Sequence, residues 1–189
     1  MVDFSPAVSL MPKLTQTLDL SNIVKQFNLE PGMRAADLGS GSGYFTIEMA
    51  KILGESGKVT AVDILDTALE TVRAKVQLSG LENVQLVRAN LEVLGSTFLA
   101  DDSQDFVLLA NVLFQNDQKI EIMREAKRIL KPGHRLAIID WEKGKGGLGP
   151  PDELRAPKES ILAFASQEGL TFEKEIFVDA YHFGLMFRK

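Results

Sequence analysis

The sequence predicts an α/β fold in which a mostly parallel sheet is covered by helices on both faces. Short apolar runs alternate with segments of helical periodicity from residue 33 to the end of the chain. Residues 106–110 are apolar without interruption, which is typical of a parallel strand that is buried on both faces. The 189 residues, of which 45% are apolar and 25% charged, fit one globular domain.

Seven short apolar runs are the expected strands. They lie at residues 33–38, 58–63, 83–88, 106–110, 135–140, 171–178 and 181–188. Only Asp179 and Ala180 separate the last two runs, and a parallel crossover needs roughly a dozen residues. We therefore expect the final strand to run antiparallel to the strand before it.

Apolar residues three and four apart predict the helices between these strands. They lie at residues 44–53, 65–76, 122–130 and 157–168. Leu20, Ile23, Val24 and Phe27 predict one more helix near the start. We expect residues 1–30 to form a helical cap on a single domain that spans residues 1–189.

Composition excludes or disfavours several functional classes. The absence of cysteine excludes disulfides, thiolate metal sites and cysteine nucleophiles, and we expect no metal site. The net charge of -5 and the pI of about 5.1 disfavour nucleic acid as a partner. No apolar run approaches the roughly 20 residues that span a bilayer, and the start of the sequence lacks the pattern of a secretory signal. We therefore expect a cytoplasmic protein without a membrane span.

A glycine-rich segment, Asp-Leu-Gly-Ser-Gly-Ser-Gly at 37–43, follows the first expected strand. A tight strand–helix turn would explain the glycines, and so would a ligand that approaches bare backbone. A dinucleotide-binding fingerprint would need glycine where Tyr44 stands, and the segment does not match a P-loop. Asp37 would repel pyrophosphate and favour a ligand with a cationic group, such as an α-ammonium group.

A second carboxylate, Asp63, ends the second expected strand, 20 residues after Gly43. An acidic residue at this spacing can accept hydrogen bonds from both ribose hydroxyls. Its alternative role is to cap the next helix, but Asp66 and Thr67 are better placed for that. Together, Asp37 and Asp63 describe a ligand with a free ribose and a cationic end, which fits S-adenosylmethionine.

The chain resembles the class I S-adenosylmethionine-dependent methyltransferases, in particular the small ubiquinone/menaquinone-biosynthesis-like group (methyltransferase type 11/25). The resemblance covers about residues 20–189, and its most specific part is residues 36–45. Supporting segments are 60–63, 87–90, 105–107 and 130–133. The resemblance implies a Rossmann-like three-layer sandwich whose seven strands follow the order 3-2-1-4-5-7-6, with strand 7 antiparallel.

The resemblance also implies which residues contact the cofactor. The glycine segment would face its methionine end, Asp63 would hold the ribose, and Ala89 and Asn90 would bracket the adenine, with the Asn90 side chain accepting from the exocyclic amine. Asn111 would line the methyl end. The whole expected set is Asp37, Gly39, Ser40, Gly41, Gly43, Tyr44, Asp63, Ile64, Ala89, Asn90, Leu91 and Asn111.

Many relatives carry histidine just after the fourth strand, where this chain has Gln115. Glutamine is not a base near neutral pH, so we expect no histidine-dependent mechanism at that position.

The acceptor side is expected where the fifth and last strands meet at the edge that binds ligands in open α/β sheets. Asp140 and Trp141 end the fifth strand, and Tyr181 and His182 begin the last. Because side chains alternate along a strand, Tyr181 and His182 should face opposite sides. His182 is then either a core residue or a base. The segment 142–152 is either a flexible connection or a lid.

The function expected is in-line transfer of a methyl group from S-adenosylmethionine to an unidentified small-molecule acceptor. Placement of the acceptor can supply most of the acceleration, so no catalytic base is required. A quinone precursor, another metabolite, a lipid or a protein remain open as acceptors, and so does the oligomeric state. The alternatives are a non-catalytic S-adenosylmethionine-binding regulatory module and a nicotinamide-dependent reductase.

Overall fold

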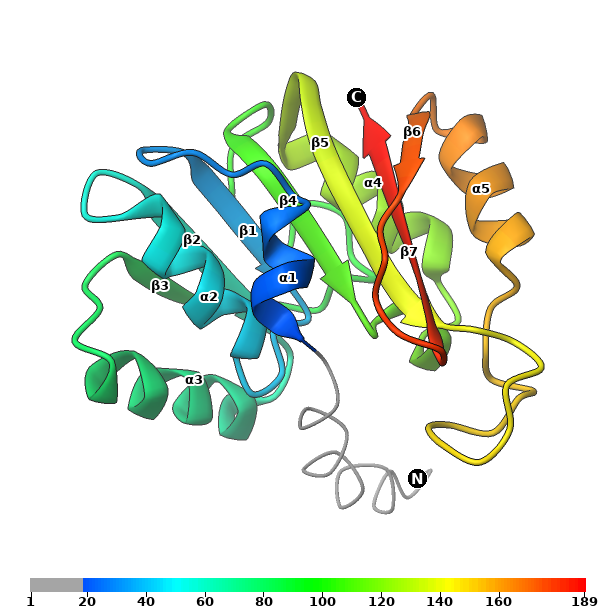
Figure 1. The fold of residues 1–189 in the computed structure, drawn as a ribbon. Coiled ribbons are helices and arrows are strands. Elements are labelled where there is room, and N and C mark those ends of the chain that lie inside the picture. The colour runs from blue at the N-terminus through cyan, green and yellow to red at the C-terminus, as the bar shows by residue number, and fades with distance from the viewer. Residues whose placement is uncertain (1–18) are drawn as a thin grey trace.

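The computed structural model describes residues 19–189, and its centre is one seven-stranded sheet (Figure 1). The strands follow the order β3-β2-β1-β4-β5-β7-β6. All neighbours are parallel except that β7 runs antiparallel to both β5 and β6. The bounds are β1 Arg34–Leu38, β2 Lys58–Asp63, β3 Val84–Arg88, β4 Gln104–Ala110, β5 Leu130–Trp141, β6 Thr171–Glu175 and β7 His182–Arg188. The predicted strand order and the antiparallel final strand are confirmed.

Helices cover both faces of this sheet and complete the predicted three layers. Their bounds are α1 Leu20–Lys25, α2 Tyr44–Leu53, α3 Asp66–Leu78, the short 3₁₀ helix η2 Leu113–Gln115, α4 Lys119–Ile129 and α5 Lys158–Gln167. On one face, α1 and α2 bury a core in which Phe27 stacks on Phe106 of β4 at 5.0 Å between ring centroids. On the other face, α4 and α5 bury Ile122 and Ile161 against Leu136 and Phe187.

The last connection differs from the prediction. Strand β6 ends at Glu175, so residues 176–181 link it to β7, and not only Asp179 and Ala180. The backbone N–H of Ile176 donates to the carbonyl of Gly184 at 2.8 Å, which holds the start of this link against β7. Six residues are still too few for a parallel crossover, so the topological argument is unaffected.

The N-terminal cap falls only partly within the described residues. Residues 1–18 lie outside them. The predicted helix is present as α1, whose Ile23 and Val24 are buried against the sheet and α2. Among residues 19–189, no helix has both the length and the apolar character needed to cross a membrane.

One edge of the sheet gathers the predicted site residues. The carboxyl ends of β1, β2, β3, β4 and β5 meet there with the amino end of β7. The connections that leave this edge are residues 39–43, 64–65, 89–103, 111–118 and 142–157. We refer to it as the ligand edge.

Candidate active site

The glycine loop, residues 39–43, turns the chain from β1 into α2. Gly39, Gly41 and Gly43 all have positive φ, at 77°, 51° and 75°. A Cβ at Gly39 would lie 2.4 Å from a methyl of Val112, and one at Gly43 would lie 2.8 Å from a methyl of Val72. A Cβ at Gly41 would have nothing within 4 Å. Two of the glycines therefore serve packing, and Gly41 presents bare backbone to open space at the ligand edge.

Asp63 ties the end of β2 to this loop. Its Oδ2 accepts from the backbone N–H of Gly41 at 2.8 Å, and its Oδ1 accepts from the N–H of Leu65 at 3.0 Å. The expectation that Asp66 or Thr67 caps α3 is wrong, because Leu65 is the N-cap residue and no side chain caps this helix. Each Asp63 oxygen keeps a lone pair that can accept another hydrogen bond. Ribose binding by Asp63 stays a prediction.

Asp37 is a buried carboxylate just before the loop. Its Oδ2 accepts from the Thr46 hydroxyl at 2.5 Å, and its side chain lies near Asp63. Burial raises the pKa of Asp37 to about 6, the Thr46 hydrogen bond opposes this shift, and the charge of Asp63 adds to it. The carboxylate is thus ionised at neutral pH at a cost that a cationic ligand would relieve.

The expected adenine contacts lie after β3. Ala89 and Leu91 are buried, whereas Asn90 is exposed, and Ile64 on the neighbouring connection is 51% exposed. Oδ1 of Asn90 accepts from the backbone N–H of Glu92 at 3.0 Å, so this oxygen is held in place. These residues flank one exposed stretch of the ligand edge, and their contacts with adenine stay a prediction.

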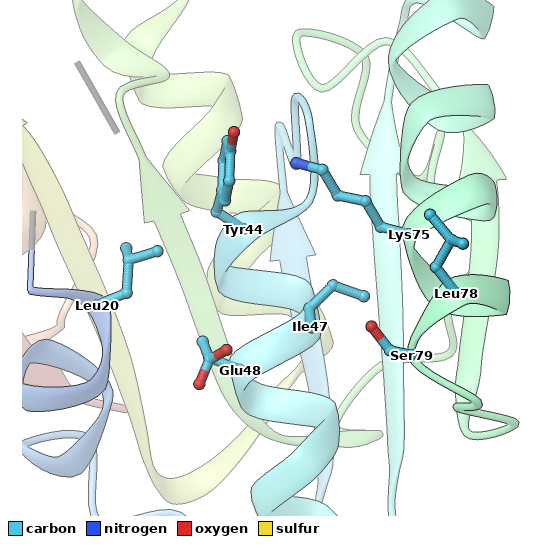
Figure 2. A pocket seen from close by; sticks show the side chains of 7 residues that line it. All are labelled: Leu20, Tyr44, Ile47, Glu48, Lys75, Leu78 and Ser79. Atoms are coloured by element: carbon cyan, nitrogen blue, oxygen red, sulfur yellow. The ribbon is translucent and has the colours of Figure 1, made fainter. Parts of the chain in front are cut away.

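Tyr44 begins α2 and lies beside a lysine that the sequence did not single out. Figure 2 shows the Lys75 ammonium reaching toward Tyr44 and the glycine loop; its Nζ lies 3.3 Å from the Tyr44 ring centroid and 2.8 Å from the Ser42 carbonyl oxygen. The two residues line a pocket between α1, α2 and α3 together with Leu20, Ile47, Glu48, Leu78 and Ser79. No motif marks Lys75, because it comes from α3, 31 residues after Tyr44 in the chain.

Asp140 lies at the predicted edge, but backbone groups occupy its carboxylate. Its two oxygens accept from the N–H groups of Leu113, Phe114 and Trp141 at 2.9, 3.1 and 2.8 Å. Burial raises the pKa of Asp140 to about 6 against the effect of these hydrogen bonds. Asp140 therefore holds η2 against the end of β5. In η2, the Gln115 side chain donates to the carbonyl of Asn111 at 3.3 Å.

Trp141 and His182 face each other across β5 and β7. They are register partners, and their ring centroids lie 4.0 Å apart. His182 is buried, and its Nδ1 lies 2.9 and 3.0 Å from the two carboxylate oxygens of Asp179. Tyr181 is 37% exposed, as expected for a neighbour that points the other way. Asp179 was missed because its pairing with His182 depends on the turn that leads into β7.

The segment 142–155 is an ordered loop held by the buried Arg155. The guanidinium donates to the backbone carbonyls of Glu142, Lys145, Leu148 and Pro150. It also lies 5.4 Å from the centroid of the Trp141 ring. For the predicted segment 142–152, these contacts favour a structured cover over Trp141 and not a flexible connection.

Comparison with known proteins gives the family. A model described as a methyltransferase domain matches residues 29–159, which is more than half of the chain. The chain belongs to the class I S-adenosylmethionine-dependent methyltransferases. S-adenosylmethionine is therefore its cofactor, and the nicotinamide-dependent reductase is set aside.

Several relatives of this methyltransferase carry more specific names. Two proteins named ubiquinone/menaquinone biosynthesis C-methyltransferase UbiE are 35% identical over 127 residues (Shewanella woodyi) and 37% identical over 114 residues (Vibrio vulnificus). The matches cover 64% and 60% of this chain but 49% and 43% of those proteins, so the chain matches about half of their length. A solved methyltransferase from Aquifex aeolicus aligns over 95% of this chain and 94% of its own, with 28% identity and a TM-score of 0.84.

Two buried oxygens test whether the ligand edge fits the methyltransferase cofactor. Ser40 Oγ and Asn111 Oδ1 are buried and have no hydrogen-bond partner among the described residues. Asn111 has a φ of 58°, which is rare for a residue other than glycine and is common at functional sites. Both residues lie where β1 and β4 end side by side. Oxygens that lack donors suit the α-ammonium group of S-adenosylmethionine, so the residues present fit this cofactor.

Proposed function

We propose that this methyltransferase transfers a methyl group from S-adenosylmethionine to a small-molecule acceptor at the ligand edge by in-line displacement. The observation that carries the proposal is the arrangement around Gly41. Open space lies over its bare backbone, and Asp63 holds its N–H. Just past the neighbouring ends of β1 and β4 lie the oxygens of Ser40 and Asn111, which have no partner among residues 19–189.

Different residues of the ligand edge hold different parts of the cofactor. Asp37, Ser40 and Asn111 supply negative charge and acceptor oxygens for its methionine end, and Asp63 accepts from the ribose. Ala89, Asn90 and Leu91 flank the adenine. When bound, the cofactor supplies a methyl group on a positively charged sulfur, which leaves as a neutral thioether. The protein's part is placement, because holding the reacting atoms about 3–3.5 Å apart in line accounts for much of the acceleration.

For the acceptor, we propose a carbon atom of an aromatic quinone precursor. The names of the relatives support this choice. Trp141, Tyr181 and His182 lie where β5 ends and β7 begins, and they offer aromatic and polar groups at the ligand edge.

The test is a methylation assay with purified protein, methyl-labelled S-adenosylmethionine and reduced quinone precursors. The proposal predicts a product that carries the label on a ring carbon and an equal amount of S-adenosylhomocysteine. The assay is repeated with other small molecules and with a cell lysate as acceptors. If the cofactor binds but its labelled methyl group is transferred to none of these acceptors, the chain is a non-catalytic regulatory module instead.

A further inference from the structure

Two ring nitrogens at the ligand edge are buried without a partner. Trp141 Nε1 and His182 Nε2 belong to two rings whose centroids lie 4.0 Å apart and whose planes are tilted by 39°. Neither nitrogen has a hydrogen-bond partner among residues 19–189. Trp141 is 3% exposed and His182 6%. Since buried polar atoms are nearly always hydrogen-bonded, two such atoms on neighbouring rings mark a place that suits a polar group.

Asp179 determines which nitrogen of the His182 ring carries the proton. A carboxylate only accepts hydrogen bonds, so its contacts of 2.9 and 3.0 Å require the proton of His182 to be on Nδ1. Burial lowers the pKa of His182, Asp179 opposes this, and Arg155 adds to it, so the ring is neutral at neutral pH. Nε2 is then an acceptor. The indole Nε1–H can only donate. Asp179 and Arg155 are the charged groups whose fields act on this ring.

We propose that Trp141 Nε1 and His182 Nε2 together bind a hydroxyl group of the methyl acceptor. A hydroxyl accepts one hydrogen bond through its oxygen and donates another through its proton, which matches one donor and one acceptor. A carboxylate could satisfy only Trp141, and an ammonium group only His182. The inference rests on the proposed function and adds that the acceptor carries a phenolic or enolic hydroxyl at this position.

This arrangement makes His182 a catalytic residue and Asp179 its positioning residue. The hydroxyl proton moves to His182 Nε2, the oxygen keeps the electron pair of the O–H bond, and Asp179 stabilises the imidazolium. That electron pair drives a new bond from the oxygen, or from a conjugated ring carbon, to the methyl carbon. The methyl–sulfur bond breaks at the same time, and sulfur leaves neutral. In carbon methylation, the proton on the attacked carbon is then lost to solvent, and the oxygen regains a proton.

The loop 142–155 covers the six-membered ring of the Trp141 indole. Gly149 lies against the indole so closely that a Cβ there would come within 2.4 Å of Trp141 Cζ3. Arg155 gathers the rest of the loop through its carbonyl hydrogen bonds. The loop therefore helps to fix the position of the indole whose Nε1 is proposed to bind the hydroxyl.

The experiment uses NMR of nitrogen-labelled wild-type protein with S-adenosylhomocysteine bound. The chain has two histidines and one tryptophan, so few side-chain signals need assignment. His134 is the internal control, because it lies in the half of β5 away from the ligand edge and its Nδ1 lies 3.1 Å from the Asp105 carbonyl oxygen. The probes are hydroquinone and its dimethyl ether, which has the same ring without hydroxyl protons.

The expected result is that hydroquinone shifts the signals of His182 Nε2 and the Trp141 indole N–H, while the ether shifts neither and His134 is unchanged. Trp141→Phe keeps a ring but removes the donor, and we expect hydroquinone to bind about 3–10-fold more weakly. His182→Gln should abolish the response of the indole signal to hydroquinone while S-adenosylhomocysteine still binds.

The outcomes separate this inference from the proposed function. Failure of S-adenosylhomocysteine to bind, measured by calorimetry on the same sample, would refute the proposed function. If S-adenosylhomocysteine binds normally but hydroquinone does not shift the His182 Nε2 signal, the hydroxyl site alone is refuted. The partner of the two nitrogens would then be a buried water. An equal shift by the dimethyl ether would also overturn the hydroxyl site, because no hydroxyl would be involved.

Discussion

Asp63 and Gly41 are joined by a 2.8 Å hydrogen bond from the backbone N–H of the glycine to the carboxylate. The bond links the end of β2 to the one loop glycine with open space above it. The predicted ribose contact and the bare backbone therefore form one rigid unit, in which the loop is held in place before the cofactor arrives.

Replacing Asp63 tests its role in this unit. Asp63→Ala should cost about 1.5–3 kcal/mol of cofactor binding, the range for hydrogen bonds to a charged group, or roughly 10–150-fold in affinity. Calorimetry with S-adenosylhomocysteine measures this loss. Asp66→Ala is the matched control, since this carboxylate lies three residues further on and forms an exposed ion pair with Arg88. An unchanged affinity in Asp63→Ala would remove the residue from the site.

Gly41→Val, compared with Gly80→Val, separates the loss of space for the ligand from the strain that a side chain causes at positive φ. Gly41 and Gly80 both have positive φ, at 51° and 63°, and neither has an atom within 4 Å of a Cβ. Valine should cost about 1–2 kcal/mol of stability at either position. Only Gly41→Val should lose cofactor affinity, because its side chain fills the space over the loop. Equal affinity in the two variants would contradict the placement of the cofactor.

The features that could be predicted from the sequence are those whose residues interact over short distances along the chain. The β1–loop–α2 unit was predictable because glycines and Tyr44 act within a few residues of one another. The strand order followed from the resemblance and from the short final connection. The pairing of Lys75 with Tyr44 and the hold of Arg155 on its loop join separate elements. The sequence placed Asp140 at the correct edge but carries no sign that backbone N–H groups of η2 occupy its oxygens.

The ionised Asp37 should lower the stability of the fold and raise the affinity for the cofactor. Its pKa of about 6 in the folded protein is above the ordinary 3.8, so the folded state binds more protons, and stability falls as pH rises through this window. Asp37→Asn should therefore gain about 1–3 kcal/mol at pH 7 and little near pH 4, because two pKa units are worth that order of energy. Melting temperatures across this range measure the difference. A variant that is less stable than wild type at pH 7 would contradict it.

The same charge should attract the cationic end of the cofactor. Wild-type affinity for S-adenosylmethionine should rise between about pH 5 and 7 as Asp37 ionises, whereas Asp37→Asn should bind more weakly with a flatter profile. Calorimetry at several pH values tests this. Identical profiles for the two proteins would show that the charge of Asp37 does not contribute to cofactor binding.

Arg155 should hold the loop 142–155 closed. Arg155→Leu removes hydrogen bonds to four carbonyls, so the loop should open and trypsin should cut faster after the exposed Lys143 and Lys145. Arg124→Leu is the control, because Arg124 is on α4 and pairs with Glu121 and Glu168 far from this loop. Cleavage at the wild-type rate in Arg155→Leu would show that other contacts close the loop.

We expect S-adenosylmethionine to bind over Gly41, between Asp37 and Asp63. Glycine-selective labelling gives amide signals from 15 residues, and titration with S-adenosylmethionine reads each of them at once. The account predicts the largest shifts at Gly39, Gly41 and Gly43, with Gly57 and Gly169, away from the ligand edge, unchanged. Saturable binding that leaves the Gly41 amide unmoved would contradict it.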